Sequence, residues 1–387
     1  MKIKISKKQM IIAGAALFLI AATLTITAIA KARQFKVAFY GVGDELIAPL
    51  KESIVKKVPK AKFIILNAEH PLPAKSAEKY SVVICWNGKT LDEISDNAII
   101  FPESFYNRYP SNIKKICGEE GKRHVVPLLL DYFELAEYKP AKSILGLEVP
   151  ETWEQLAEYL KAVKVRCKYP IVCAGSSDRE LMGFVSAIGE SVLGNEGYSE
   201  LVSDLESNWV QKKEFPELLK KVLEVIDELQ ENALLNPRWY DANQRDADIF
   251  MEDHSAGIFA MTMEMHKRCD FVFVREFETN PVPLYNTKKN HSLMSPMLCA
   301  VINDNRDETH AVVEYLASEE GQGFLSNETH LAPVFSHSET YDKRTTDIRY
   351  WAAAYPMPPV TFLDDAALTD PAAKKELADA IRQWFVK

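Results

Sequence analysis

Short apolar runs alternate with amphipathic helical patterns along most of this chain, and that alternation narrows the possible folds more than any other feature. In the first part, apolar runs at residues 35–40, 63–66, 81–86 and 125–130 are separated by helical or turn-rich sequence. Continuous apolar runs of this kind are typical of strands covered on both faces. Because such strands alternate with helices, the sequence predicts an α/β fold of mostly parallel sheets flanked by helices.

The second part of the chain continues the pattern with longer helical stretches. Thr152 followed by Gln155 is a capping-box pattern, which predicts a helix that begins at Trp153. Further strands are expected at 169–174, 258–263, 271–274 and 297–302, and helices at 180–235, 308–316 and 372–385. The length of 387 residues is more than one hydrophobic core usually serves, so two domains are expected.

The N-terminal segment indicates export or anchoring. Four lysines within residues 2–8 precede an uncharged apolar run, Met10–Ala30, whose 21 residues match the roughly 20 that span a bilayer. Residues 28–30 and 30–32 also have the small-x-small form of a signal-peptidase site. Residues 1–33 are therefore predicted to be a cleaved signal peptide or a retained membrane anchor. Both place the rest of the chain outside the cytoplasm, in the periplasm or on the outer face of the cytoplasmic membrane.

Charge and cysteine usage exclude several classes of protein. The net charge is −9, and setting aside the six Lys and Arg of residues 1–33 leaves 40 basic against 55 acidic residues, a net of −15. An acidic body repels phosphate backbones, so nucleic acid is not an expected partner. The six cysteines lack the CxxC spacing of zinc and redox sites, and Cys85, Cys173 and Cys299 fit buried thiols. No cysteine lies near the apolar run, which excludes a lipid-modified N-terminal cysteine.

Motifs for catalysis and cofactor binding are missing from the sequence. The glycine pair Gly41 and Gly43 is followed by two acidic residues, which would repel a phosphate. The acid-rich stretch 241–253 lacks the central glycine of a calcium loop, and neither HExxH nor GxSxG occurs. No cofactor or metal is therefore predicted. A pair of cleft carboxylates acting as in a glycosidase stays open, because the sequence does not show which acids face each other.

Four segments follow one another in a familiar order and spacing. They are Gly121–Lys139, which contains Pro127; Val149–Leu156; the stretch 250–262; and the stretch 300–334. In this arrangement they resemble the extracellular solute-binding proteins of ABC importers, of the sugar-binding maltose-binding type (family 1). The resemblance covers most of residues 34–387.

The resemblance implies a two-lobed periplasmic-binding-protein fold of type II, with crossing segments as its hinge. Residues 34–130 and 296–335 would form lobe 1, and residues 131–295 and 336–387 lobe 2. A small-molecule solute, a carbohydrate in this family, would bind reversibly in the cleft, and closure would present it to the ABC permease subunits in the membrane. Such a protein is not an enzyme.

The resemblance also places candidate ligand contacts in the cleft. They comprise a polar residue after the first strand, an aromatic and polar pair after the third, a carboxylate and its neighbours in the crossing segment, an aromatic pair after a proline, an acid after Ala-Met-Thr, and a late aromatic ring. These are Asp44, Trp86, Asn87, Asp131, Tyr132, Glu134, Trp239, Tyr240, Glu264 and Trp351.

Other roles for these residues stay open. Trp86 and Trp351 also fit simple packing, and Asp131 also fits an interlobe hydrogen-bond acceptor or a partner of Arg123. Residues 265–267 are Met-His-Lys where many sugar binders have Gly-x-Trp, which removes one stacking ring. Two other functions stay open: a membrane-anchored sensory or assembly protein with the same fold, and a hydrolase that uses cleft carboxylates.

Overall fold

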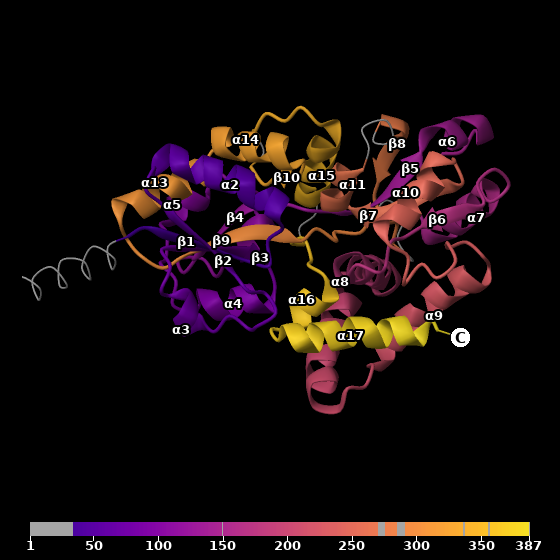
Figure 1. Cartoon of the computed structure of the whole chain (residues 1–387), viewed down its shortest axis with the longest axis horizontal. Coiled ribbons are helices and arrows are strands. Elements are labelled where there is room, and N and C mark those ends of the chain that lie inside the picture. The colour runs from indigo at the N-terminus through magenta and orange to yellow at the C-terminus, as the bar shows by residue number, and fades with distance from the viewer. Residues whose placement is uncertain are drawn as a thin grey trace, which may run out of the picture.

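The computed structural model describes residues 34–148, 150–269, 275–284, 291–335, 337–354 and 357–386. It shows mixed α/β structure with two sheets that lie side by side along the long axis, each covered by helices (Figure 1). The predicted α/β class is confirmed. The N-terminal segment 1–33 and the strand expected at 271–274 lie outside the described residues. Among the residues that are described, no helix combines the length and apolar character needed to cross a bilayer.

The first sheet has six strands in the order β10-β4-β9-β3-β1-β2. Only β1 pairs with its neighbours in parallel, while β9 is antiparallel to both β3 and β4. The sheet is therefore mixed and not mostly parallel as expected, because β9 returns from the other half of the molecule and runs away from the hinge. We call the part built on this sheet the first lobe. Its strands are β1 (Lys36–Tyr40), β2 (Lys62–Leu66), β3 (Val82–Trp86), β4 (Val125–Leu130), β9 (Met297–Ile302) and β10 (Ala332–Pro333).

Among the described residues, the second sheet has four strands in the order β6-β7-β5-β8, of which β6 and β7 are parallel and the other pairs antiparallel. Its strands are β5 (Phe133–Tyr138), β6 (Tyr169–Val172), β7 (Ala256–Thr262) and β8 (Phe277–Asn280). β5 continues directly from β4 through two residues, so the chain passes from one sheet to the other at Asp131. We call the part built on this sheet the second lobe.

Helices cover both faces of the first sheet (Figure 1). α2 packs with α13 and α14 on one face, and α3 packs with α4 on the other. α15 contributes Ile348 and Ala352 to the core of the first lobe, although residues 336–387 were assigned to the second lobe from the sequence. The boundaries of the lobes stay a prediction. The helices are α2 (Asp44–Lys57), α3 (Ala74–Ala77), α4 (Lys89–Ser95), α5 (Glu103–Tyr106), the 3-10 helix η1 (Ile113–Lys115), α13 (Asp307–Leu316), α14 (Glu319–Thr329) and α15 (Lys343–Ala353).

The second lobe is dominated by α8, which runs for 35 residues and bends at Gly194. That residue has φ 70° and ψ 173°, a conformation that glycine adopts without a steric penalty. α9, α16 and α17 pack along α8. At the start of α7, Thr152 Oγ1 accepts from Gln155 N at 3.3 Å, which confirms the predicted cap. The helices are α6 (Lys139–Leu145), α7 (Trp153–Val163), α8 (Asp178–Lys212), α9 (Glu217–Glu231), α10 (Gln244–Glu252), α11 (Met263–Arg268), α16 (Leu363–Ala367) and α17 (Pro371–Trp384).

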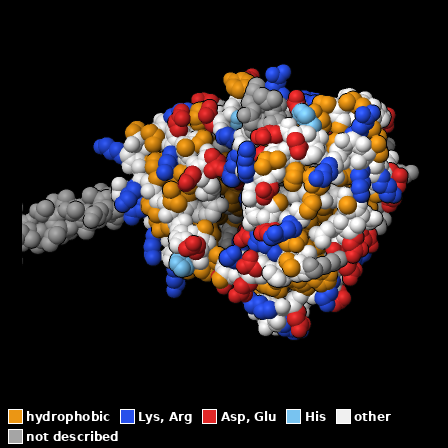
Figure 2. Space-filling view, turned by 45° about the vertical axis from the view of Figure 1, so that its right-hand side comes forward, with side chains coloured by type: hydrophobic (Ala, Val, Ile, Leu, Met, Phe, Trp, Pro, Cys, Tyr) orange, Lys and Arg blue, Asp and Glu red, His pale blue; other side chains and the backbone are white. Residues whose placement is uncertain are grey.

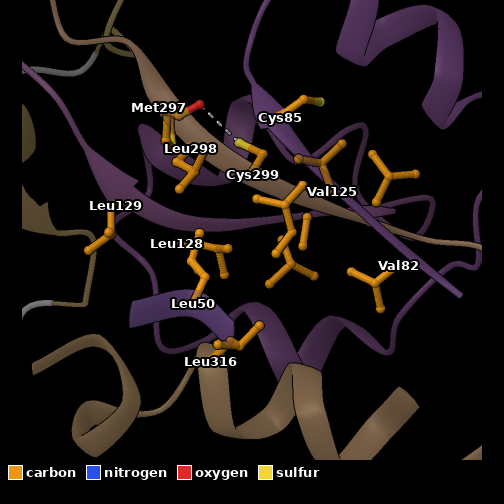
Figure 3. Close-up of a cluster of buried hydrophobic side chains, with 14 of the residues drawn as sticks. Leu50, Val82, Cys85, Val125, Leu128, Leu129, Met297, Leu298, Cys299 and Leu316 are labelled. Carbon is orange, nitrogen blue, oxygen red and sulfur yellow. Dashed lines mark hydrogen bonds between the residues drawn. The ribbon is translucent and has the colours of Figure 1, made fainter. Parts of the chain in front are cut away.

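The cores of the two lobes are separate clusters of buried side chains. Figure 3 shows part of the first core, where Cys85 of β3 and Cys299 of β9 lie among leucine and valine side chains. These two cysteines are paired residues of antiparallel strands, and all six cysteines of the chain are free and buried. The predicted role of Cys85, Cys173 and Cys299 as buried thiols is therefore confirmed.

Three chain segments cross between the lobes and form the hinge. Asp131 N donates to Pro296 O at 2.8 Å, and Phe133 N donates to Met294 O at 3.0 Å. Ser295 N donates to Val360 O at 2.9 Å, which adds a third segment beside the other two. The sequence indicated the crossings near Asp131 and Ser295, and the predicted lobe bounds put a third crossing between residues 335 and 336 and not at Val360.

A buried carboxylate of α8 holds the second crossing segment. Glu190 accepts from Ser292 Oγ at 2.5 Å and from Leu293 N at 2.9 Å. Burial raises the pKa of Glu190 to about 7, although these hydrogen bonds act in the opposite direction. The folded protein therefore binds a proton here more tightly than the unfolded chain does.

The stability contribution of Glu190 is fully present below the pKa of an unfolded-state glutamate and is lost as the pH rises through about 7. We expect Glu190→Gln to flatten the fall in unfolding free energy between pH 5 and 7 by up to about 1 kcal/mol per pH unit. Urea unfolding at several pH values measures this slope. The exposed Glu376 serves as control, since Glu376→Gln should leave the slope unchanged. An unaltered slope for Glu190→Gln would contradict the prediction.

Candidate functional site

A cavity of about 360 Å³ lies between the two lobes, where strands β1 and β3 of the first lobe end. The carboxyl ends of parallel strands are the usual place for ligands in open α/β sheets. The opposite wall comes from the first turn of α8, from α16 and from the start of α17. Figure 2 shows a hollow between the two halves of the molecule, with basic and acidic side chains along its rim. The cavity is lined by Tyr40, Gly41, Ala68, Cys85, Trp86, Thr90, Asp178, Arg179, Asp364, Asp365, Pro371 and Lys374.

Arg179 is the central side chain of this region. Its guanidinium lies 4.2 Å from the ring centroid of Trp86, donates to Asp131 Oδ2 at 2.7 Å and lies 3.1 Å from Glu264 Oε2. Burial alone would lower the pKa of Arg179, but Asp131 and Glu264 raise it above its ordinary value. The guanidinium therefore covers one face of the ring that the sequence offered as a stacking platform.

Asp131 is fully buried and is fixed by several donors. Its carboxylate accepts from Tyr132 N at 2.9 Å and from Glu264 N at 3.2 Å, in addition to the bond from Arg179. The alternative pairing with Arg123 is wrong, because Arg123 pairs with Glu103 instead. Asp131 thus sits at the hinge and joins it to α8 and α11.

Glu264 extends the charged network toward the first lobe. It pairs with Arg268 at 2.9 Å, and Arg268 also pairs with Glu45 in the first turn of α2. Burial raises the pKa of Glu264, while Arg179 and then Arg268 lower it. A second pair, Lys89 with Glu206, joins α4 to α8. These ion pairs connect the lobes on both sides of the cavity.

The loop after β3 approaches the second lobe closely. Gly88 has φ +136°, and a Cβ atom on it would lie 2.4 Å from the carbonyl oxygen of Asp365 in α16. Glycine is therefore required here both for the backbone conformation and for the contact between lobes. Just before it, the buried amide of Asn87 accepts from Met297 N at 2.7 Å and so fixes the end of β3.

A second polar cluster lies on the other side of the hinge strand. Tyr132 donates from its hydroxyl to Ser292 O at 2.8 Å, and its ring centroid lies 5.6 Å from that of Trp351. Since successive residues of an extended chain point to opposite sides, Asp131 faces Arg179 while Tyr132 faces Trp351. Tyr132 and Trp351 therefore do not line the cavity.

Glu134 belongs to that second cluster and is bonded to His266 Nδ1. Arg344 lies 2.7 Å from His266 Nε2 and can only donate, so Nε2 accepts and Nδ1 carries the proton donated to Glu134. The cluster joins α15 of the first lobe to β5 and α11 of the second. Glu134 thus contributes to contact between the lobes and not to the cavity wall.

The remaining predicted positions differ widely in exposure. Asp44 is exposed at the start of α2, next to Glu45. Trp239 is fully buried in the second core, and its indole N–H donates to Gln230 Oε1 at 3.1 Å. Tyr240 packs on Phe385 with ring centroids 6.1 Å apart. The last two rings therefore pack the second lobe away from the cavity.

Sequence reasoning missed the basic residues Arg179, Arg268 and Lys374 and also missed three acidic residues, Glu45, Asp364 and Asp365. Arg179 opens a helix directly after strand β6 and a short turn, where ligand-binding side chains of α/β folds gather. The position of Arg179 could therefore have indicated, from the sequence alone, that this residue belongs to the site. Lys374 and Arg268 stand inside helices, and nothing in their sequence context indicates that they face the other lobe. No group of three or more His, Cys, Asp or Glu side chains that could hold a metal occurs in the described part of the chain.

Comparisons with known proteins identify the fold. No protein-family model and no curated protein matches the sequence. The bacterial solute receptor AcbH, described as exclusive for β-D-galactopyranose, matches with a TM-score of 0.67 at 12% identity, over 92% of this chain and 99% of its own. RafE from Streptococcus pneumoniae in its apo form matches with a TM-score of 0.63 at 16% identity, over 91% of this chain and 97% of its own. The putative binding protein MsmE from Bacillus subtilis, in an open conformation, matches with a TM-score of 0.67 at 12% identity, over 91% of this chain and 95% of its own.

AcbH is described as a receptor for a sugar, and RafE has also been solved with raffinose. The chain therefore has the two-lobed fold of solute-binding proteins. The resemblance to the maltose-binding type, inferred from four sequence segments, is confirmed at the level of fold.

Proposed function

We propose that this protein is the solute-binding component of an ABC importer, and that it captures a sugar-like solute between its lobes without turning it over. The observation that carries the proposal is the cavity at the ends of β1 and β3, placed beside a hinge of three crossing segments. Its volume of about 360 Å³ falls in the range of ~300–1,000 Å³ typical of small-molecule sites. A cavity beside a hinge suits reversible capture by lobe closure.

Three of the ten predicted contacts remain in the proposed site. Trp86 lines the cavity and offers an aromatic face, and Asp131 and Glu264 hold the guanidinium of Arg179 that lies on it. Aromatic faces suit the apolar side of a sugar ring, and carboxylates accept its hydroxyls. Asp44 and Asn87 border this region at the ends of the same strands. Tyr132, Glu134, Trp239, Tyr240 and Trp351 have the packing and interlobe contacts described above, and we do not propose them as ligand contacts.

We further propose that the described part of the chain works outside the cytoplasmic membrane, next to a permease. Support comes from the basic and apolar sequence of residues 1–33 and from the fold shared with a probable secreted solute-binding lipoprotein from Streptomyces coelicolor. ATP hydrolysis would then belong to other subunits, because the sequence has no phosphate-binding loop of its own.

A thermal-shift screen of the purified protein against sugars, oligosaccharides, polyols and small organic acids tests the proposed function. A ligand that binds only the folded state stabilises it by RT ln(1 + [L]/Kd), so a true solute raises the unfolding temperature with concentration. Product analysis of the positive compounds should show no conversion. A panel without any stabilising sugar or polyol would contradict the proposal, and turnover of a glycoside would replace it with an enzyme.

The ring of Trp86 gives a direct prediction for any sugar found in that screen. We expect Trp86→Ala to weaken binding by about 1–3 kcal/mol, because the variant loses the aromatic face of the cavity. Isothermal titration measures the effect. Trp384→Ala is the matched control, since Trp384 packs on Phe215 in the second lobe and does not line the cavity. Equal affinity in both variants would remove Trp86 from the binding site.

A further inference from the structure

One of the charged side chains that line the cavity has no partner of opposite charge among the described residues. Arg179 is already paired with Asp131 and Glu264, and Lys374 Nζ lies 2.6 Å from Asp365 Oδ1. Asp178 is paired with Arg382 at 2.6 Å. Asp364 is the carboxylate that remains: within the described residues it forms no ion pair, although it also lines the cavity.

Asp364 lies in the first turn of α16, and its buried Oδ1 has no hydrogen-bond partner in the part of the chain that the structure describes. Burial raises the pKa of Asp364 to about 7, the negative charge of Asp365 adds to the effect, and the attraction of Lys374 opposes it. An unpaired carboxylate inside a protein is costly, and a bound cation would remove that cost.

The facing wall supplies a second polar atom without a partner. Thr90 in α4 is 8% exposed, lines the cavity, and its Oγ1 has no hydrogen-bond partner among the described residues. Tyr40 and Trp86 contribute aromatic rings to the same wall. The cavity thus combines a carboxylate oxygen on one lobe with a hydroxyl oxygen on the other, both without a hydrogen-bond partner among the described residues, and with aromatic surface beside the hydroxyl.

We propose that the solute of this cavity is a sugar-like molecule carrying a protonated amine, with Asp364 as its counter-ion. This inference rests on the proposed function. The ammonium group would donate charge-assisted hydrogen bonds to Asp364 Oδ1, and a ring hydroxyl would bond Thr90 Oγ1. The ring of Tyr40 would add the attraction of an aromatic face for a cation. An acidic sugar has no comparable partner, because Arg179 and Lys374 are already paired with carboxylates.

Titration of matched sugars on the wild-type protein tests the inference. The probes are glucosamine, N-acetylglucosamine and glucose, and the corresponding galactose series, at about pH 7, where such amines are largely protonated. In the series that binds, we expect the free amine to bind roughly tenfold to hundredfold more tightly than the acetylated and the neutral sugar. Acetylation removes the charge while keeping the ring, so it isolates the ammonium group.

Asp364→Asn should abolish this preference, so the ratio between the affinities for the free amine and for the neutral sugar should fall to about one. Asp241→Asn changes the net charge equally at an exposed position outside the cavity and should keep the preference. Thr90→Val should weaken all sugars of the binding series alike. Neutral sugars that bind as tightly as the amines would overturn the inference and leave the proposed function standing. Failure of every sugar and amino sugar, here and in the wider screen, would overturn the proposed function as well.

Discussion

Replacing Arg179 with alanine is expected to lower the free energy of unfolding by about 3–5 kcal/mol, because the change leaves the buried carboxylate of Asp131 without its cation and leaves Glu264 with Arg268 alone. Asp131 is 0% and Glu264 5% exposed, so neither can recover its solvation in water. The side chain of Arg179 is itself 24% exposed, which favours the lower end of that range. Urea unfolding of the wild type and the variant measures the difference.

Two further variants separate charge from geometry. Arg179→Lys keeps the positive charge but cannot bridge both carboxylates while lying flat on Trp86. Its stability should therefore fall between that of the wild type and that of Arg179→Ala. Arg238→Ala removes an arginine from an exposed pair with Asp241 and should cost no more than about 1 kcal/mol. If Arg179→Ala loses no more stability than Arg238→Ala, the network is not a stabilising part of the folded protein.

The sequence was sufficient to predict the fold because the fold depends on local patterns. The apolar runs that form β1, β3, β4 and β9 lie where they were expected, and so does the crossing at Asp131. The order and direction in which the strands pair could not be predicted from such local patterns. β9 inserts antiparallel between β3 and β4 only because the chain first travels through the second lobe, and no property of its own six residues encodes that direction.

The candidate site was harder to predict, since it depends on which side each residue faces. Asp131 and Tyr132 are adjacent in sequence but lie on opposite sides of the hinge strand, one against Arg179 and the other against Trp351. Trp239 and Tyr240 follow a proline, as a binding loop often does, but the ring of Trp239 is buried beside Phe184 and Phe385. Aromatic residues on loops are found both in cores and in ligand sites, so the residue type alone did not show which role Trp239 and Tyr240 have.

The contacts between the lobes connect the fold to its proposed use. Arg268 with Glu45 and Lys89 with Glu206 are pairs between exposed or half-buried side chains, each worth little on its own. The guanidinium of Arg179 on Trp86 is more enclosed and joins α8 to the end of β3. A solute that enters the cavity must therefore compete with or rearrange contacts that the protein already makes. Its affinity consequently depends on how closely the two lobes approach each other.

Gly88→Ala provides the sharpest test of that dependence. A methyl group at this position would lie 2.4 Å from the carbonyl oxygen of Asp365, so the lobes must move apart to accept it. Overpacking of this kind costs about 1–3 kcal/mol, and we expect a roughly tenfold to hundredfold loss of affinity for the solute together with a larger radius of gyration in X-ray scattering. Gly121→Ala is the control, because Gly121 also has a positive φ, +77°, but its added Cβ would meet no atom within 4 Å. Wild-type affinity and scattering in Gly88→Ala would show that the contact between Gly88 and Asp365 plays no part in holding a bound solute.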